Sequence, residues 1–124
     1  EDDLLIRPDK NPNTAGARAV FGESALREPA FPAGTDLVLV WGEGCNFATL
    51  PAGAKIIFLN SYLQPENGHA DVFLPISIQT ERAGTYTNFA GVVTGFEQCF
   101  PRKSTVADAQ DVFAAIAPGA AARP

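Results

Sequence analysis

The sequence has few of the residues that bind metals or form disulfides. It contains one histidine, His69, and two cysteines, Cys45 and Cys99, with no Cys-x-x-Cys pair. A lone histidine without a cysteine or histidine cluster does not make a metal site, so we expect His69 to be a polar residue at the entrance of a strand. A disulfide requires Cα atoms about 5.5–6 Å apart. We expect instead two reduced, mostly buried thiols, as in cytoplasmic proteins.

Long apolar runs and an excess of basic residues are also missing. The longest apolar stretch falls far short of the roughly 20 residues of a membrane-spanning helix, and no secretory hydrophobic region opens the chain. The net charge of −5 argues against a surface for nucleic acid or anionic membranes.

No Gly-x-Ser-x-Gly motif positions a serine nucleophile. We therefore predict no catalytic residue in this chain.

The length and composition are those of one globular domain. The chain has 124 residues, of which 46% are hydrophobic and 19% are charged, and this size can bury a core without disulfides. The acidic start Glu1-Asp2-Asp3 resembles a cut inside a longer protein. We expect residues 1–124 to be a single α/β domain excised from a larger subunit.

Three apolar runs predict consecutive strands of a parallel sheet. They occupy residues 36–41, 55–60 and 70–74, and continuous apolar, β-branched runs are typical of strands buried on both faces. The connections between them are near the minimum length of a parallel crossover. Their helices should therefore be short or replaced by loops, and we expect one short helical turn at residues 47–50.

The amino-terminal part predicts an edge strand and a helix. Residues 4–6 form a short apolar run that suits an edge strand. A helix is expected over residues 14–20, with Asn13 or Thr14 as its cap and Gly22 as its stop.

The carboxyl-terminal part predicts a return strand and a closing helix. The strand is expected over residues 91–100, with a bulge at Gly95. The helix should be capped by Ser104 or Thr105 and carry Asp108 in its first turn. Its apolar face would comprise Val106, Ala109, Val112, Phe113 and Ile116.

A glycine-rich segment follows the first buried strand. Gly42-Glu43-Gly44-Cys45-Asn46 leaves its carboxyl end, which is where open α/β sheets bind ligands. Glycine backbone can approach a phosphate closely, and Asn46 could bond a base or sugar. Phe47 stands where the third glycine of a dinucleotide motif would be. A nucleotide-type site and a plain tight turn both remain open interpretations.

Two carboxylates are predicted to have structural roles. Asp71 lies in an otherwise apolar run and therefore needs a partner. We expect that partner to be backbone N–H groups at the strand entrance. Glu81, with Gly84 and Thr85, predicts a turn in which the carboxylate accepts backbone N–H bonds.

Residues 70–91 resemble the molybdopterin oxidoreductase superfamily. The chain has Ala-Asp-Val-Phe-Leu-Pro at residues 70–75 and Glu-x-x-Gly-Thr-Tyr-x-Asn-x-x-Gly at residues 81–91. The family pattern is Ala-Asp-Val-Val-Leu-Pro, then Glu-x-x-Gly-Thr-Phe-x-Asn-x-x-Gly-Arg. Asn13-x-x-Gly16-Ala17 is similar to a stretch in the large iron–sulfur subunit of bacterial respiratory NADH:quinone oxidoreductase, complex I. The resemblance spans residues 11–117.

The resemblance implies a fold and a role. The fold would be a three-layer Rossmann-like domain with a short, mainly parallel sheet, as in formate dehydrogenase and DMSO reductase domains. The role would be a structural lobe of the large iron–sulfur subunit, which takes part in electron transfer from NADH to quinone only within the whole complex. Its partners would be other domains of that subunit and other respiratory-complex subunits, in the cytoplasm and peripheral to the inner membrane.

The alternative implied by the resemblance is a domain that binds the nucleotide arm of molybdopterin guanine dinucleotide in a formate dehydrogenase-type enzyme. The positions that correspond to cofactor-binding ones are Gly42, Gly44, Asn46, Asn60 and Ser61.

The chain departs from the family pattern in ways that favour the complex I branch. Val92 replaces the family's Arg, Thr94 its Gln, and Ala90 an acidic residue. The large iron–sulfur subunit of complex I generally lacks a molybdenum site, so eroded motifs suit it better. We expect no cofactor and no metal in this chain itself. The parent subunit would carry iron–sulfur clusters or, in the alternative, molybdopterin guanine dinucleotide.

Overall fold

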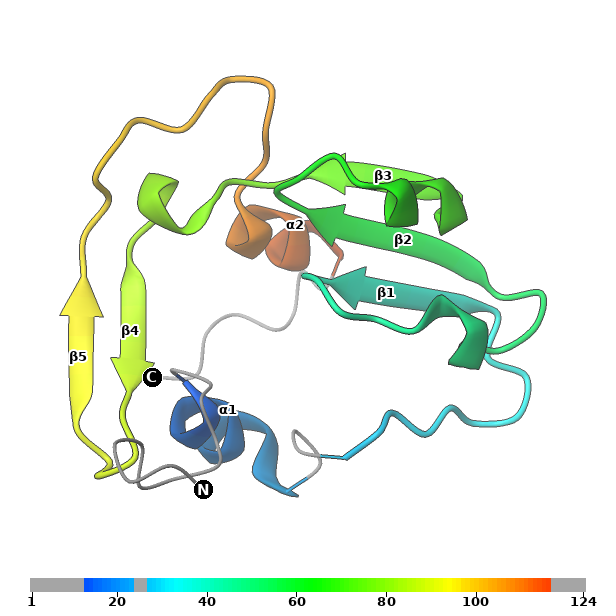
Figure 1. Cartoon of the computed structure of the whole chain (residues 1–124), viewed down its shortest axis with the longest axis horizontal. Helices are drawn as coiled ribbons and strands as arrows, with labels where there is room; N and C mark the ends of the chain where they lie inside the picture. Colours follow the sequence, from blue (N-terminus) through cyan, green and yellow to red (C-terminus); the bar gives the residue numbers. More distant parts are fainter. Residues whose placement is uncertain (1–12, 24–26, 117–124) are drawn as a thin grey trace. The chain divides into compact units, whose positions relative to one another are not determined.

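The computed structural model describes residues 13–23 and 27–116 (Figure 1). It mixes helices and strands and divides into two compact units. Unit 1 comprises Glu1–Ala30 and Ala83–Glu97, and unit 2 comprises Phe31–Arg82 and Gln98–Pro124. The edge strand predicted for residues 4–6 lies outside the described residues. The expectation of one excised domain stays a prediction.

Unit 2 contains a three-stranded parallel sheet in the order β1-β2-β3. The strands are β1 (Leu37–Trp41), β2 (Lys55–Asn60) and β3 (Val72–Pro75), and consecutive strands pair in parallel. The predicted parallel arrangement is therefore confirmed. The third strand begins two residues later than predicted, because the Ala70 N–H still bonds to the Asn67 carbonyl in the preceding turn.

Side chains alternate between two apolar clusters on the sheet, as the period of a strand requires. Val38, Val40 and Phe58 form one buried cluster, and Leu59, Ile76 and Ala109 form the other. The prediction that the first strand is buried on both faces holds only in part. Leu39 is half-buried in the second cluster, and the two ends of β1, Leu37 and Trp41, are exposed.

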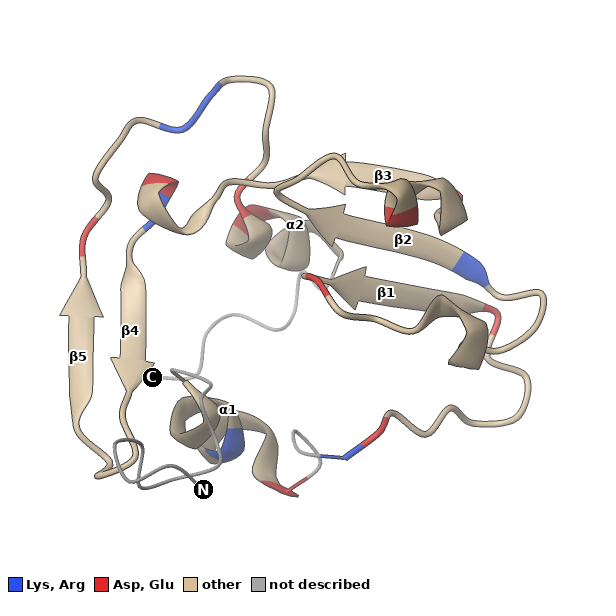
Figure 2. Ribbon diagram, viewed as in Figure 1, with Lys and Arg blue, Asp and Glu red and all other residues tan. Residues whose placement is uncertain are grey.

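The connections between the parallel strands are short, as predicted. The β1–β2 connection holds the 3-10 turn η2 (Phe47–Thr49), and the β2–β3 connection holds η3 (Pro65–His69). The 3-10 turn η4 (Gln79–Glu81) follows β3. In Figure 2 the charged residues lie mainly at strand ends and in connecting segments, so the middle of each strand is uncharged.

The closing helix α2 (Ala109–Ile116) begins later than predicted. The predicted cap at Ser104 or Thr105 is wrong, because Asp108 Oδ1 accepts the Gln110 N–H at 2.8 Å and so takes the capping position. Residues before the helix are held by the sheet instead: Ala107 pairs with Ile76 in an isolated parallel bridge. That bridge extends the edge of β3 and keeps the segment extended.

Unit 1 consists of α1 (Thr14–Phe21) and the antiparallel hairpin of β4 (Gly84–Thr87) and β5 (Val93–Phe96). Gly22 ends the helix as predicted, with φ of 66°. The bulge predicted at Gly95 is wrong, because Gly95 pairs directly with Thr85 in an unbroken register. No described residue of unit 1 is buried.

Candidate functional site

The carboxyl edge of the parallel sheet brings the loop after β1 to the end of β2. The Gly42 N–H donates to the Leu59 carbonyl at 2.9 Å. Gly42 and Gly44 have φ of 89° and 82°, which residues other than glycine rarely adopt. A Cβ on either glycine would meet no atom within 4 Å. The turn conformation therefore requires these glycines, and the space above the loop is open.

Asn46 caps the next turn. Its Oδ1 accepts the Ala48 N–H at 3.2 Å, and its carbonyl accepts the Thr49 hydroxyl at 2.8 Å. The side-chain oxygen is thus committed to starting η2, and the side-chain NH₂ is the group left for a ligand. The neighbouring Cys45 packs against the first apolar cluster, and burial raises the pKa of its thiol.

Asn60 and Ser61 lie together where β2 ends. Asn60 is 3% exposed, and its Oδ1 accepts the N–H groups of Ser61 at 2.7 Å and Tyr62 at 3.4 Å. The Ser61 hydroxyl donates to the Ser77 carbonyl at 3.0 Å. These bonds fix the turn after β2 against the segment that follows β3.

Ser77 also lies at this edge, and its sequence context predicted neither a catalytic nor a ligand-binding role for its hydroxyl. It is fully buried, although serine between two isoleucines directly after a predicted strand is a detectable signal. Within the described part of the chain, neither Ser77 Oγ nor Asn60 Nδ2 has a hydrogen-bond partner. Buried polar groups are normally satisfied. The edge therefore holds two polar groups that are buried and unpaired in the described structure.

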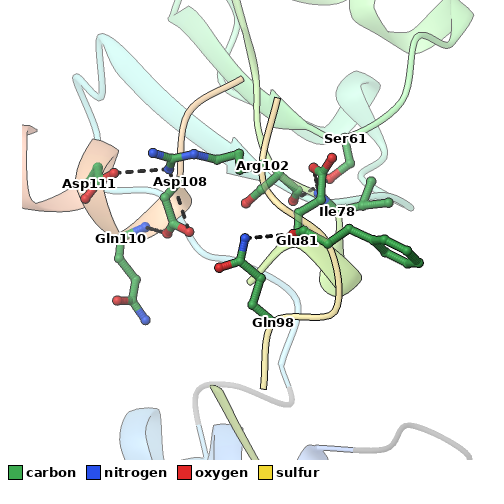
Figure 3. A network of polar contacts seen from close by, with 10 residues as sticks. Ser61, Ile78, Glu81, Gln98, Arg102, Asp108, Gln110 and Asp111 are labelled. Atoms are coloured by element: carbon green, nitrogen blue, oxygen red, sulfur yellow. Dashed lines mark hydrogen bonds and ion pairs between the residues drawn. The ribbon is translucent and has the colours of Figure 1, made fainter. Parts of the chain in front are cut away.

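A polar network continues from this edge toward α2 (Figure 3). Glu81 Oε2 accepts the Ile78 N–H at 3.2 Å, which confirms the predicted backbone partner of this carboxylate. Gly84 and Thr85, predicted to share the turn, lie instead in strand β4. Arg102 lies near two carboxylates, at 3.2 Å from Asp111 and 3.9 Å from Asp108. Asp108 and Asp111 are carboxylates at the start of α2, where the helix dipole favours negative charge, and Arg102 pairs with both.

The opposite, amino-terminal edge holds the predicted partner of Asp71. Asp71 Oδ2 accepts the Ile56 N–H at 2.9 Å, which confirms the expected backbone contact. Its Oδ1 also accepts from Lys55 Nζ at 2.7 Å. The hydrogen bond from Lys55 lowers the pKa of the Asp71 carboxyl, and the same bond raises the pKa of Lys55.

A hollow of about 410 Å³ also opens at this amino-terminal edge, away from the glycine loop. It is lined by Phe31, Pro32, Ala33, Gly34, Thr35, Thr49, Pro51 and Ala52. The hydroxyls of Thr35 and Thr49 both donate to backbone carbonyls, and no lining residue is charged. The hollow thus offers little to orient a polar ligand.

The histidine and the cysteines do not converge. His69 stacks on Phe47, with ring centroids 5.1 Å apart. Cys45 and Cys99 form no disulfide, as expected, but Cys99 is exposed, so the prediction of its burial is wrong. Cys99 lies in the extended segment after β5, where the Cys99 N–H bonds to the Thr80 carbonyl. Across residues 13–23 and 27–116, no three His, Cys, Asp or Glu side chains cluster as metal ligands.

Comparisons with protein-family models, with curated proteins and with solved structures find no match to this chain. Neither helix of the described residues is long and apolar enough to cross a membrane.

Proposed function

We propose that this chain is a structural lobe of a larger redox subunit, of the kind that the large iron–sulfur subunit of respiratory NADH:quinone oxidoreductase contains. The observation that carries the proposal is the exposure of its apolar side chains. Among the described residues, six apolar side chains are buried and twelve large ones are exposed. The large apolar side chains that are exposed outnumber the apolar side chains that are buried, which favours a neighbouring domain that covers part of them.

The exposed apolar residues of unit 2 include both ends of its first strand. Leu37 and Trp41 are each 54% exposed, and Leu63, in the segment after β2, is 88% exposed. An apolar strand end gains about 25 cal/mol per Å² when a neighbour covers it. A neighbouring domain against β1 would supply that cover.

Unit 1 supports the same interpretation independently. It pairs an eight-residue helix with a two-stranded hairpin, and Val20, Val92 and Val93 are more than half exposed. A hairpin needs packing that buries apolar surface to be stable in water, and no described residue of this unit is buried. Packing against neighbouring domains would stabilise it.

The arrangement of unit 2 is that expected of a Rossmann-like lobe. Three consecutive parallel strands with short crossovers, and a glycine turn at their carboxyl edge, favour a three-layer Rossmann-like domain. In this role the lobe carries no chemistry of its own. It takes part in electron transfer from NADH to quinone only within the assembled complex, peripheral to the inner membrane on the cytoplasmic side, where it contacts other domains and subunits.

The test is metal and pterin analysis of the complete polypeptide that contains this chain, purified without oxygen. We expect iron, four-cysteine cluster motifs elsewhere in the polypeptide, and no molybdenum. A complete polypeptide consisting of these 124 residues alone would overturn the proposal. Molybdenum or tungsten with a guanine dinucleotide pterin would replace it by the alternative below.

The alternative is a domain that binds the guanine dinucleotide arm of a molybdopterin cofactor. It is favoured by Asn60 Nδ2 and Ser77 Oγ, two buried groups without partners in the described structure, beside Ser61. Such groups each cost about 1–3 kcal/mol when unsatisfied. Both are shielded from solvent, so the edge would have to open for a ligand oxygen to satisfy them. Gly42 and Gly44 would let phosphate oxygens approach the loop backbone, with the Asn46 amide beside them.

Thermal unfolding with millimolar GDP or GMP tests this alternative. A ligand present at about 100 times its dissociation constant raises the free energy of unfolding by about 2.7 kcal/mol. We expect a GDP-dependent rise that Ser77→Ala reduces and Ser104→Ala, an exposed control, leaves unchanged. No shift at millimolar nucleotide would exclude the alternative and leave the structural lobe.

A further inference from the structure

Asn67 differs from every other asparagine of the chain in being followed by glycine. The six asparagines are Asn11, Asn13, Asn46, Asn60, Asn67 and Asn88. A side chain on the following residue hinders attack of its backbone nitrogen on the asparagine amide, and glycine has none. We propose that Asn67 is a site of spontaneous deamidation, which converts it to aspartate or isoaspartate.

The reaction needs only water as a co-reactant. The backbone nitrogen of Gly68 loses its proton and forms a bond to Asn67 Cγ, while the Cγ–Nδ2 bond breaks and ammonia leaves. The product is a five-membered succinimide. One water then opens either of its two carbonyls, which gives aspartate or isoaspartate at position 67. No atom is oxidised or reduced.

The surroundings of the pair allow this reaction. Gly68 is exposed, and a Cβ built on it would meet nothing within 4 Å. The Asn67 side chain is held by two long hydrogen bonds: Oδ1 accepts the Gln64 N–H at 3.4 Å, and Nδ2 donates to the Tyr62 carbonyl at 3.3 Å. Both exceed the usual range of about 2.7–3.2 Å, so they restrain the amide weakly.

The modification would act on the turn at the carboxyl edge of β2. Loss of Nδ2 removes the donor that ties η3 to the Tyr62 carbonyl, one residue after Ser61. A carboxylate at position 67 would also lie next to Glu66 in sequence and add repulsion. Isoaspartate would lengthen the backbone inside η3, two residues before His69 and its stacking on Phe47.

Peptide mapping by mass spectrometry, after incubation of the purified chain at mildly alkaline pH, tests the proposal. We expect conversion of Asn67 to exceed that of every other asparagine, with isoaspartate as one product. The matched control is Gly68→Ala. Because Gly68 does not have a positive φ and the space is open, alanine fits the fold while its Cβ hinders the attack, and conversion should fall several-fold.

Two results would overturn the proposal. One is conversion of Asn67 no faster than that of the buried Asn60 in the folded chain. The other is an equal rate in Gly68→Ala and the unchanged chain. Circular dichroism of both proteins establishes that they are equally folded, so neither result can come from a misfolded variant.

Discussion

The carboxylate of Asp71 and the ammonium group of Lys55 meet at 2.7 Å and join the entrances of two neighbouring parallel strands. The same carboxylate accepts the Ile56 N–H. One side chain thus fixes the start of β3 against both the backbone and the side chain of β2. This contact gives the first prediction, which concerns pH.

Replacing Asp71 with Asn should flatten the acid limb of the stability profile. The folded pKa of Asp71 is lowered, chiefly by the hydrogen bond from Lys55. The stability that the ionised carboxylate contributes is therefore present above the unfolded pKa of about 3.9 and is lost as pH falls through the folded pKa. The free energy of unfolding of the unchanged chain should therefore rise from strongly acidic pH toward about pH 5. Denaturant melts across this range measure it, and a profile unchanged in Asp71→Asn would contradict the assignment.

Lys55 should set the alkaline limit of the pH range in which this ion pair stabilises the fold. Its folded pKa is raised, so its contribution is present below its unfolded pKa and is lost as pH rises through the folded pKa. Asp36→Asn, an exposed carboxylate at the start of β1, serves as the control for a general charge effect and should keep both limbs.

Replacing Asn13 with Ala should destabilise unit 1. Asn13 Oδ1 accepts the Thr87 N–H at 2.8 Å and so joins the start of α1 to β4. Loss of the acceptor leaves a part-buried N–H unpaired, which costs about 1–3 kcal/mol. Asn13→Asp keeps an acceptor oxygen and should recover most of the loss. Hydrogen exchange of the Thr87 amide reports on this contact directly, and equal exchange in both variants would contradict it.

Replacing Gly84 with Ala should destabilise the hairpin. A Cβ at this position would lie 2.8 Å from Phe96 Cζ, and Phe96 stacks on Tyr86 with centroids 5.1 Å apart. Displacing that ring should cost about 1–3 kcal/mol. The matched control is Gly95→Ala in the paired strand, where the nearest atom lies at 4.0 Å. Chemical denaturation of the two variants compares them, and equal stabilities would refute the predicted clash.

Replacing Ser77 with Ala should stabilise the ligand-free chain. The Ser77 hydroxyl is buried without a partner in the described structure, so its removal recovers about 1 kcal/mol of the desolvation cost. Ser61→Ala should have the opposite effect, because it removes the bond from the Ser61 hydroxyl to the Ser77 carbonyl. A loss of stability in Ser77→Ala would show that a bound water or ligand satisfies the hydroxyl.

Local patterns predicted the parallel sheet and most of its connections. The runs at β1 and β2 are continuous and β-branched, and they allow little besides buried strands. The wrong predictions concern features that are set by contacts between residues far apart in the chain. The Gly95 bulge was inferred from glycine alone, but its partner Thr85 accommodates it in register. The cap of α2 moved to Asp108 because the bridge between Ile76 and Ala107 holds the preceding segment extended.

The candidate site shows the same division. Gly42 and Gly44 could be named from their position after an apolar strand, where open α/β sheets bind ligands. Asn60 and Ser61 could be named only through the family resemblance. Two features of the site could not be predicted from the sequence: Asn46 is committed to capping η2, and Ser77 has no partner in the described structure. Both depend on atoms that folding brings together. The fold also explains why glycine stands three residues after Asn13. A Cβ at Gly16 would clash with Asn13 Oδ1, the oxygen that accepts the Thr87 N–H.

The three strands of the parallel sheet, the helix α1 and the glycine turn after β1 follow from the sequence, as does the need of Asp71 and Glu81 for backbone partners. These features arise from neighbouring residues and the periods of regular structure. Long-range contacts set the start of α2 and the strand β4, which of those partners are met, which polar groups are buried without one, and which apolar side chains stay exposed. Such properties depend on contacts between residues far apart in the chain, and no local pattern records them.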